Sequence, residues 1–320
     1  MFYLGVDGGG TKTAFALCSR KGQILASCVT GTSHPDQIGL DQVRETLNEG
    51  LQAVCDTAGI DRNQIAYSIW GLPGYGENLD HVRIQDEMVG ELLDTPNYKC
   101  VNDVEVGWAG SLACRPGLHM VAGTGSIGFG KDPLGRIARC GGWGEFMGDE
   151  GSAHWLGRKL LQLFAKQADH RLEKTVSYSI VRKHFDLKRD LDLVPLITAE
   201  NERDAIAQLA RIAYQAAQAG DPHVIGLYRE AALELSQTYQ GLAKQLDFPP
   251  ITPIPASYSG GVFNAGDFIL KPLQSQLDLV NIALQKPKLT PILGACLYAL
   301  ENGAVQWDDQ TVATLKEGNL

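Results

Sequence analysis

A run of polar and glycine residues near the N-terminus has the composition of a phosphate-binding turn. The run is Asp7, Gly8, Gly9, Gly10, Thr11, Lys12 and Thr13. Successive glycines let a ligand approach the main chain with no Cβ in the way. Main-chain N–H groups, two hydroxyls and an ammonium group could bind phosphate, and Asp7 could hold a hydrated Mg²⁺. An ordinary Gly-rich hairpin is the alternative.

The segments around this turn predict β-strands on both sides. Residues 2–6 are apolar and β-prone, large Phe15 and Leu17 alternate with smaller residues over 14–18, and residues 24–29 read as a further strand. Both the P-loop and the dinucleotide-binding fingerprint need a turn that opens a helix, and neither motif is present. The sequence therefore predicts a phosphate-binding turn within a β-meander.

The same order of elements recurs later in the chain. A shift of 113 residues places Gly10 and Thr11 on Gly123 and Thr124, and Gly22 on Gly135. A strand, a Gly-Thr turn and a second strand are thus predicted twice. We expect two similar halves, with Gly123, Thr124, Gly125 and Ser126 forming a second phosphate turn that faces the first across a cleft, where a triphosphate would draw the halves together.

Asn102 and Asp103 follow a short predicted strand at 98–101 and precede a helical segment. Ligands of open α/β sheets collect where strands end and helices begin, so Asp103 could face a substrate hydroxyl. The alternative is that Asp103 caps the helix.

Three further segments supply candidate binding residues. Trp143, Asp149 and Glu150 lie in a Gly-rich stretch that includes Gly144, and an aromatic ring beside carboxylates is suited to a sugar. The alternative role for Asp149 and Glu150 is to place negative charge at a helix N-terminus.

A polar loop contains Ser33, His34 and Asp36, which could contact substrate or form a helix cap. Gly260 and Gly261 would let a flat base lie against the main chain.

Composition limits the remaining possibilities. The chain has 320 residues, 44% of them hydrophobic, and a net charge of −9 without long acidic runs, which argues against nucleic acid or an anionic membrane as main partner.

The cysteines at 18, 28, 55, 100, 114, 140 and 296 form no C-x-x-C pair, which indicates reduced thiols, although a disulfide between Cys100 and Cys140 stays open. Neither a signal peptide nor a membrane span is indicated, so we expect a cytoplasmic protein.

From residue 153 to 247 the chain is predicted to be mainly helical. Asp221 and Pro222 suit the N-cap and first position of a helix that carries Tyr228, Leu235 and Tyr239 on one face. A strand at 254–258, a helix at 265–275 and a last helix at 292–300, capped by Thr290, complete the expectation.

Taken together, the motifs resemble the N-acetylglucosamine kinase group of the BadF/BadG/BcrA/BcrD ATPase family, within the superfamily of sugar kinases, heat-shock proteins and actin. The motifs that carry the resemblance are residues 7–13, 102–103, 122–126, 142–152 and 259–263, in this order. The resemblance implies an α/β protein with two ribonuclease-H-like domains around an ATP cleft. It places the first domain at residues 1–116, the second at 117–290, and a C-terminal helix at 291–320 packing back on the first.

The resemblance also implies roles for single residues. Asp103 would be the catalytic base for the sugar 6-hydroxyl, and Asp7 would attend Mg²⁺. ATP would contact Gly9, Gly10, Thr11, Lys12, Thr13, Gly123, Thr124, Gly125, Ser126, Gly260 and Gly261. The amino sugar would contact Ser33, His34, Asp36, Asn102, Asp103, Trp143, Gly144, Asp149 and Glu150. A homodimer is the implied assembly.

One departure from the family concerns the sugar. Many relatives have Asn before the proline of the loop where this chain has His34 and Pro35, so N-acetylglucosamine, glucosamine or a related amino sugar could be the substrate. Two other classes stay open. An iron–sulfur activator of a 2-hydroxyacyl-CoA dehydratase would need paired cysteines in a Gly-rich segment of the second domain, and residues 122–129 contain none. A sensor that binds without transferring phosphate is the other.

Overall fold

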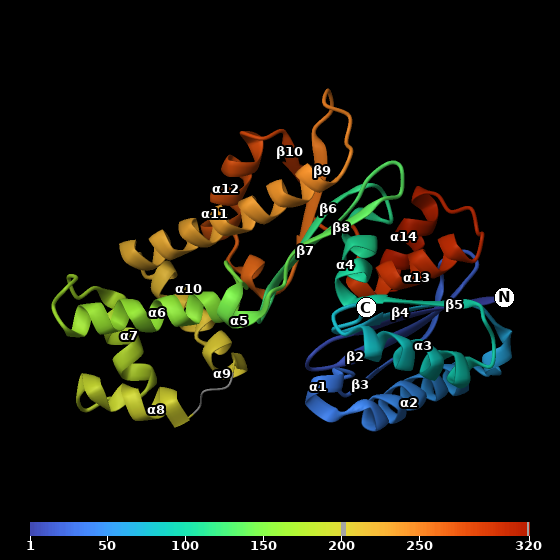
Figure 1. Ribbon diagram of the computed structural model, residues 1–320, viewed down its shortest axis with the longest axis horizontal. Coiled ribbons are helices and arrows are strands. Elements are labelled where there is room, and N and C mark those ends of the chain that lie inside the picture. The colour runs from blue at the N-terminus through green and yellow to red at the C-terminus, as the bar shows by residue number, and fades with distance from the viewer. Residues whose placement is uncertain (200–202, 319) are drawn as a thin grey trace. The chain divides into compact units, whose positions relative to one another are not determined.

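The computed structural model describes residues 1–199, 203–318 and 320, which form two compact units (Figure 1). Unit 1 comprises residues 1–116 and 286–320, and unit 2 comprises residues 117–285. Each unit contains a sheet of five strands with helices packed against it. Among the described residues no helix has the length and apolar character that a membrane span requires.

The sheet of unit 1 has the strand order β3-β2-β1-β4-β5. Its strands are β1 (Phe2–Gly8), β2 (Thr13–Ser19), β3 (Ile24–Thr30), β4 (Ile65–Leu72) and β5 (Tyr98–Asn102). Strands β1, β2 and β3 form the predicted antiparallel meander, and β4 and β5 run parallel to β1. The carboxyl ends of β1, β4 and β5 therefore lie at one edge of the sheet.

Helices cover both faces of this sheet, with α2 and α3 on one face and α4 and α13 on the other (Figure 1). The bounds in unit 1 are α1 (Pro35–Ile38), α2 (Leu40–Ala58), η1 (Arg62–Gln64), α3 (Leu79–Leu93), α4 (Asp103–Leu112), α13 (Pro291–Asn302) and α14 (Asp309–Glu317). Val43, Leu47 and Leu51 of α2 are spaced to lie on one helix face and are buried in one cluster with Phe15 and Leu17.

Glycines let α13 approach both α4 and β1. A Cβ on Gly294 would lie 2.1 Å from the main-chain N of Gly110, and a Cβ on Gly5 would lie 2.6 Å from the N of Cys296. A polar contact supports the same packing, since the Tyr298 hydroxyl donates to Glu105 Oε1 at 2.7 Å. Because α4 begins with Asp103, this packing also fixes the helix that carries the predicted base.

Unit 2 repeats the topology of unit 1, with the order β10-β9-β6-β7-β8. Its strands are β6 (Gly117–Ala122), β7 (Ser126–Lys131), β8 (Ile137–Gly141), β9 (Ile254–Ser259) and β10 (Ile282–Leu284). β6, β7 and β8 are antiparallel, whereas β9 and β10 run parallel to β6. The predicted repeat of strand, Gly-Thr turn and strand is therefore confirmed.

Most of the other residues of unit 2 are helical. Its helices are α5 (Gly144–Met147), α6 (Ala153–Ala168), α7 (Val176–His184), η2 (Asp190–Asp192), α8 (Leu193–Ala199), α9 (Arg203–Gln208), α10 (Ala210–Gln218), α11 (Pro222–Gln245), η3 (Gly261–Ala265) and α12 (Asp267–Asp278). Helix α11 begins as predicted, with the Asp221 carboxylate accepting from the N–H groups of His223 and Val224. Tyr228 and Tyr239 of this helix are buried in the core.

All seven cysteines are free thiols. Cys100 belongs to β5 and Cys140 to β8, so the pairing that the sequence left open is not formed.

The close contact between α4 and α13 predicts that a methyl group added at Gly294 destabilises the protein. We expect Gly294→Ala to lower the free energy of unfolding by about 1–3 kcal/mol, because the Cβ would overlap the main chain of Gly110. Gly226→Ala is the matched control, since Gly226 lies within α11 and its Cβ would meet no atom within 4 Å. Removing a helical glycine there should stabilise the protein by about 0.5–1 kcal/mol. Urea unfolding followed by circular dichroism measures both, and an unchanged Gly294→Ala protein would contradict the expectation.

Candidate active site

Two carboxylates meet at the carboxyl edge of the unit 1 sheet. Asp7 pairs in register with Gly71 of β4, and Asp103 directly follows β5. Burial and, to a smaller extent, the negative charge of Asp103 raise the pKa of Asp7 to about 7, while the charge of Lys12 opposes the shift. Since a nearby cation favours the ionised form of a carboxylate, this pair is suited to a divalent cation.

Hydrogen bonds within the turn and from the loop after β3 hold the turn between β1 and β2 in place. Gly9 N donates to Lys12 O at 2.9 Å, and Thr32 Oγ1 donates to Gly9 O at 2.9 Å. Thr13 Oγ1 donates to Ser33 Oγ at 2.9 Å, and both side chains are fully buried. Sequence reasoning placed Thr13 at ATP and Ser33 at the sugar, whereas the structure uses their hydroxyls to hold the turn.

The front of this turn remains accessible. Gly9 is half-buried, and Gly10, Thr11 and Lys12 are exposed. These residues are therefore available to a ligand, as the phosphate-turn prediction requires.

Asn102 connects two loops at the same sheet edge. Its Oδ1 caps α4 by accepting from Val104 N at 3.1 Å, and its Nδ2 donates to the carbonyl of Tyr75 at 2.9 Å. The Tyr75 hydroxyl in turn donates to the carboxylate of Asp86 at 3.0 Å. Asn102 is the N-cap of α4, so Asp103 is left to occupy the first turn of the helix with its Oδ1 3.0 Å from Val104 N.

His34 and Asp36 lie in the loop after β3. His34 is the N-cap of α1, and its Nδ1 accepts from Asp36 N at 3.3 Å. Asp36 is exposed. The structure shows the helix cap that was one of the two alternatives for this loop.

The turn between β6 and β7 is held by the first turn of α6. Gly123 N donates to Gly125 O at 2.9 Å within the turn. The carbonyl of Gly123 accepts from Ala153 N at 2.9 Å, and the carbonyl of Thr124 accepts from His154 N at 3.2 Å. The N–H groups at the start of a helix are otherwise unpaired, so this arrangement satisfies them and fixes the turn.

Asp149 is a structural support of this second turn. Its side chain is 3% exposed, its Oδ1 accepts from Ser126 N at 3.1 Å, and its Oδ2 forms an ion pair with Arg203 of α9. A Cβ on Gly125 would lie 2.8 Å from Asp149 Oδ1, so the carboxylate packs directly under the turn. The predicted sugar contact of Asp149 would therefore have to share the carboxylate with Ser126 N and Arg203.

The neighbouring predicted sugar residues are exposed. Trp143 is 69% exposed and precedes α5, whose first residue Gly144 has a φ of 77°. The Glu150 side chain is exposed, while its carbonyl accepts from Ser126 Oγ at 2.8 Å. Trp143 and Glu150 are therefore accessible within unit 2, unlike Asp149.

The predicted adenosine residues follow β9. Gly260 has a φ of 104°, and a Cβ there would lie 2.4 Å from the carbonyl oxygen of Ala122, so only glycine fits. The preceding Ser259 hydroxyl is 3.1 Å from Nε2 of the buried His119, whose pKa burial lowers to about 3. Gly261 begins η3. Neutral His119 thus anchors the start of this turn.

Sequence reasoning missed Arg203 and Thr32. Arg203 lies 54 residues from Asp149, with no local pattern that links them, and it also pairs with Glu145 at 3.5 Å. Thr32 stands beside the candidate Ser33, but its role depends on the main chain of Gly9, 23 residues earlier. Only the folded structure brings these groups together.

Comparison with known proteins identifies related sequences over nearly the whole chain. The model of the BadF/BadG/BcrA/BcrD ATPase family matches residues 4–299. An N-acetylmuramic acid/N-acetylglucosamine kinase of Clostridium acetobutylicum is 29% identical over 279 residues, which cover 87% of this chain and 90% of that protein. An N-acetyl-D-glucosamine kinase of Dictyostelium discoideum is 26% identical over 312 residues, which cover 94% and 98%.

A similar solved structure comes from Chromobacterium violaceum. It is described as a candidate N-acetylglucosamine kinase, and it superposes with a TM-score of 0.73 at 25% identity over 93% of this chain and 98% of that one. Similarity in sequence and in fold thus extends over both units.

The contacts of Asp149 predict a positioning role for Arg203. We expect Arg203→Gln to weaken ADP binding about tenfold, because it removes a charged partner worth about 1.5–3 kcal/mol from the carboxylate under Gly125. Arg203→Lys should restore part of the affinity. Isothermal titration calorimetry with ADP measures this without any sugar.

Arg229→Gln is the control, because Arg229 is an exposed residue of α11 in the same unit. Unaltered ADP affinity in Arg203→Gln would rule out the positioning role.

Proposed function

This chain belongs to the BadF/BadG/BcrA/BcrD ATPase family, and on that premise we propose that it transfers the terminal phosphoryl group of ATP to the 6-hydroxyl of an amino sugar. N-acetylglucosamine is the first candidate because the names of both relatives from Clostridium acetobutylicum and Dictyostelium discoideum include it. Glucosamine is the alternative that the sequence leaves open.

The observation that carries this proposal is the position of Asp103. It begins α4 at the sheet edge where Asp7 and the Gly-rich turn also lie. In the proposed reaction the sugar O6 attacks the terminal phosphorus, the bond from that phosphorus to the bridging oxygen of ADP breaks, and Asp103 accepts the hydroxyl proton. General-base catalysis of this kind contributes about 10²–10⁴ in rate.

Mg²⁺ fits the donors at this edge. Asp7 would hold the ion. Burial and the nearby Asp103 disfavour the negative charge of Asp7, and a bound cation would offset both effects. Mg²⁺ in phosphoryl-transfer enzymes is bound through one or two carboxylates and the phosphates. The ion would neutralise charge on the transferred group. Lys12, whose charge opposes the raised pKa of Asp7, would add to this neutralisation.

The two braced turns are the proposed phosphate-binding elements. In unit 1, Gly9, Gly10, Thr11 and Lys12 are accessible while Thr32, Thr13 and Ser33 hold them in place. In unit 2 the corresponding turn is Gly123, Thr124 and Gly125, supported by Ser126, Asp149 and Arg203. Rigid main-chain donors stabilise phosphate charge without reorganising during the reaction. Gly260 and Gly261 are proposed to contact adenosine.

The proposed sugar contacts are the accessible members of the predicted set. Asp103 and Asn102 come from the end of β5, and His34 and Asp36 come from the loop after β3. In unit 2, Trp143 and Glu150 are exposed, and the ring could cover an apolar sugar face. Ser33 is proposed to support the site without touching the sugar, whereas the sugar contact of Asp149 stays a prediction.

The function is tested by ADP release from Mg-ATP with N-acetylglucosamine, glucosamine, N-acetylmannosamine, N-acetylmuramic acid and glucose. We expect the highest kcat/KM with N-acetylglucosamine. Absence of sugar-dependent ADP release would refute the kinase proposal, and preference for glucosamine would replace the substrate.

The same assay with His34→Asn tests the contribution of the loop after β3. Asparagine also accepts a hydrogen bond as an N-cap, so the cap of α1 is kept and only the ring is lost. We expect a changed KM for the sugar with an unchanged KM for ATP. His34→Ala, which removes the cap as well, shows how much of the change is structural.

A further inference from the structure

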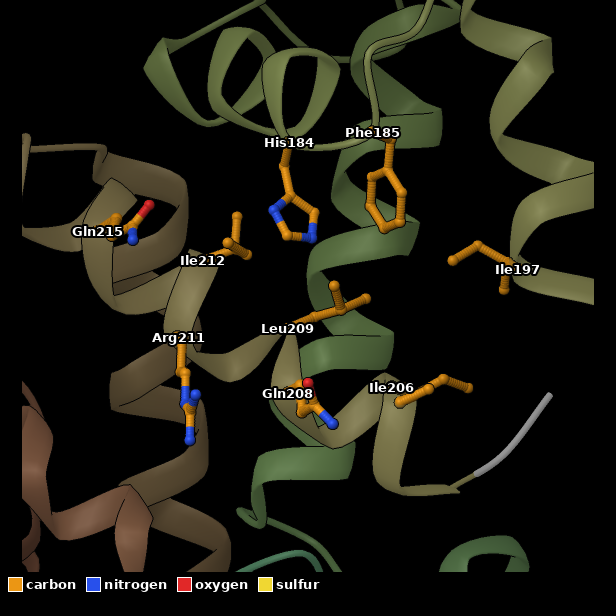
Figure 2. Close-up of a pocket in the computed structure, with 10 residues that line it drawn as sticks. His184, Phe185, Ile197, Ile206, Gln208, Leu209, Arg211, Ile212 and Gln215 are labelled. Carbon is orange, nitrogen blue, oxygen red and sulfur yellow. The ribbon is translucent and has the colours of Figure 1, made fainter. Parts of the chain in front are cut away.

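The cavity among the helices of unit 2 does not indicate a particular ligand. It has a volume of about 690 Å³ and is lined by residues between His184 and Gln215. Its polar side chains are exposed, and Figure 2 shows Arg211 pointing away from Phe185 and Leu209. A turn in unit 1, in contrast, lies next to both proposed catalytic carboxylates.

This turn follows β4, which lies between β1 and β5 in the sheet. Because the three strands are parallel, the turn leaves the same sheet edge as Asp7 and Asp103. A Cβ on Gly8 would lie 2.9 Å from Cδ of Pro73, so the turn packs against the end of β1. On its other side the turn contacts Asn102, which precedes Asp103.

The residues of the turn fix its course. Pro73 and Gly74 are its central residues, and Gly74 has a φ of 71°. Tyr75 N donates to Leu72 O at 3.2 Å. Proline followed by a glycine of positive φ is typical of a type II turn. The carbonyl of Tyr75 is then in place to accept from Asn102 Nδ2, at 2.9 Å.

Asp86 of α3 holds the side chain of Tyr75. The Tyr75 hydroxyl lies 3.0 and 3.1 Å from the two carboxylate oxygens of Asp86, and both residues are half-buried. Burial, and then the charge of Asp86, raise the pKa of the Tyr75 hydroxyl, so it stays a donor. Asp86 is itself tied to β5, because its carbonyl accepts from the Tyr98 hydroxyl at 2.8 Å and its carboxylate accepts from the Cys100 thiol. Asp86 therefore connects β5 to the turn after β4.

The Tyr75 carbonyl orients the amide of Asn102. With its Nδ2 held by Tyr75 O, the planar amide presents Oδ1 to Val104 N, from which it accepts at 3.1 Å. Asp103 Oδ1 lies 3.0 Å from the same N–H group. Loss of order in the Asn102 amide would therefore weaken the cap and loosen the first turn of α4, which carries Asp103.

We propose that Asp86 and Tyr75 are positioning residues for the base. The bond from the Tyr75 hydroxyl to the Asp86 carboxylate holds the turn, the turn holds Asn102, and Asn102 holds the first turn of α4 in one conformation. The effect on the reaction rests on the proposed kinase function, whereas the effect on α4 does not. A misplacement of about 1 Å at a catalytic group can cost about 10²-fold in rate.

Tyr75→Phe tests the inference, because it removes the hydroxyl and keeps the ring. Amide hydrogen exchange of Val104, followed by NMR, reports on the first turn of α4. We expect this exchange to be at least about threefold faster than in the wild type, because the cap is weakened. We also expect kcat with N-acetylglucosamine to fall about tenfold, with an unchanged KM for Mg-ATP.

Further variants separate this contact from a general loss of structure. Asp86→Asn keeps an acceptor for the Tyr75 hydroxyl and should retain most of kcat, whereas Asp86→Ala should lose as much as Tyr75→Phe. In the double variant of Tyr75→Phe and Asp86→Ala the losses should not add, because both changes remove the same bond. Tyr67→Phe is the matched control, since it removes a β4 hydroxyl that donates to Tyr98 O at 3.4 Å, and it should leave both measurements unchanged.

Val104 exchange distinguishes a failure of this inference from a failure of the proposed function. Faster exchange in Tyr75→Phe supports the positioning of α4 even in a protein without sugar-dependent ADP release. Unchanged exchange in Tyr75→Phe would overturn the inference. In an active kinase, a kcat of Tyr75→Phe equal to that of Tyr67→Phe would overturn it as well.

Discussion

Two carboxylates of like charge, Asp7 and Asp103, are held close together at one sheet edge, and the proposed chemistry depends on this arrangement. Burial, and then the neighbouring charge of Asp103, raise the pKa of Asp7, so the fold holds the two carboxylates together although their repulsion opposes it. The parallel pairing of β1, β4 and β5 places them there. Helix α13 packs closely, through glycines, against both α4, which begins with Asp103, and β1, which contains Asp7. One helix therefore positions the elements that carry both carboxylates.

Both phosphate turns are supported by groups from elsewhere in their own unit. In unit 1 the support comes from Thr32 and Ser33, beyond the end of β3. In unit 2 it comes from the first turn of α6 and from Asp149, which α9 holds through Arg203.

Local sequence patterns were sufficient for the framework of the fold. The meander around residues 7–13, its repeat after Ala122 and the cap of α11 at Asp221 are confirmed because each depends on neighbours in the chain. The predicted family, α/β fold class and sugar kinase class agree with the comparisons. The role of single site residues and the homodimer stay predictions.

What the sequence could not show depends on contacts between distant residues. The hydrogen bond between Thr13 and Ser33 turns two candidate ligand-binding hydroxyls into buried supports. Asp149 likewise has partners that the sequence did not indicate, because Arg203 reaches it across 54 residues; its contact with the sugar stays a prediction. Residue type and spacing identified these positions as important, but only three-dimensional contacts decide whether a polar group faces a ligand or the protein.

The central claim is that Asp103 accepts the proton of the sugar hydroxyl, and Asp103→Asn tests it most directly. The amide can still accept from Val104 N, so the first turn of α4 is preserved. The measurement is kcat with N-acetylglucosamine and saturating Mg-ATP, together with the Kd of ADP. The account predicts a decrease in kcat of about 10²–10⁴ with unchanged ADP affinity. A kcat near that of the wild type would contradict it.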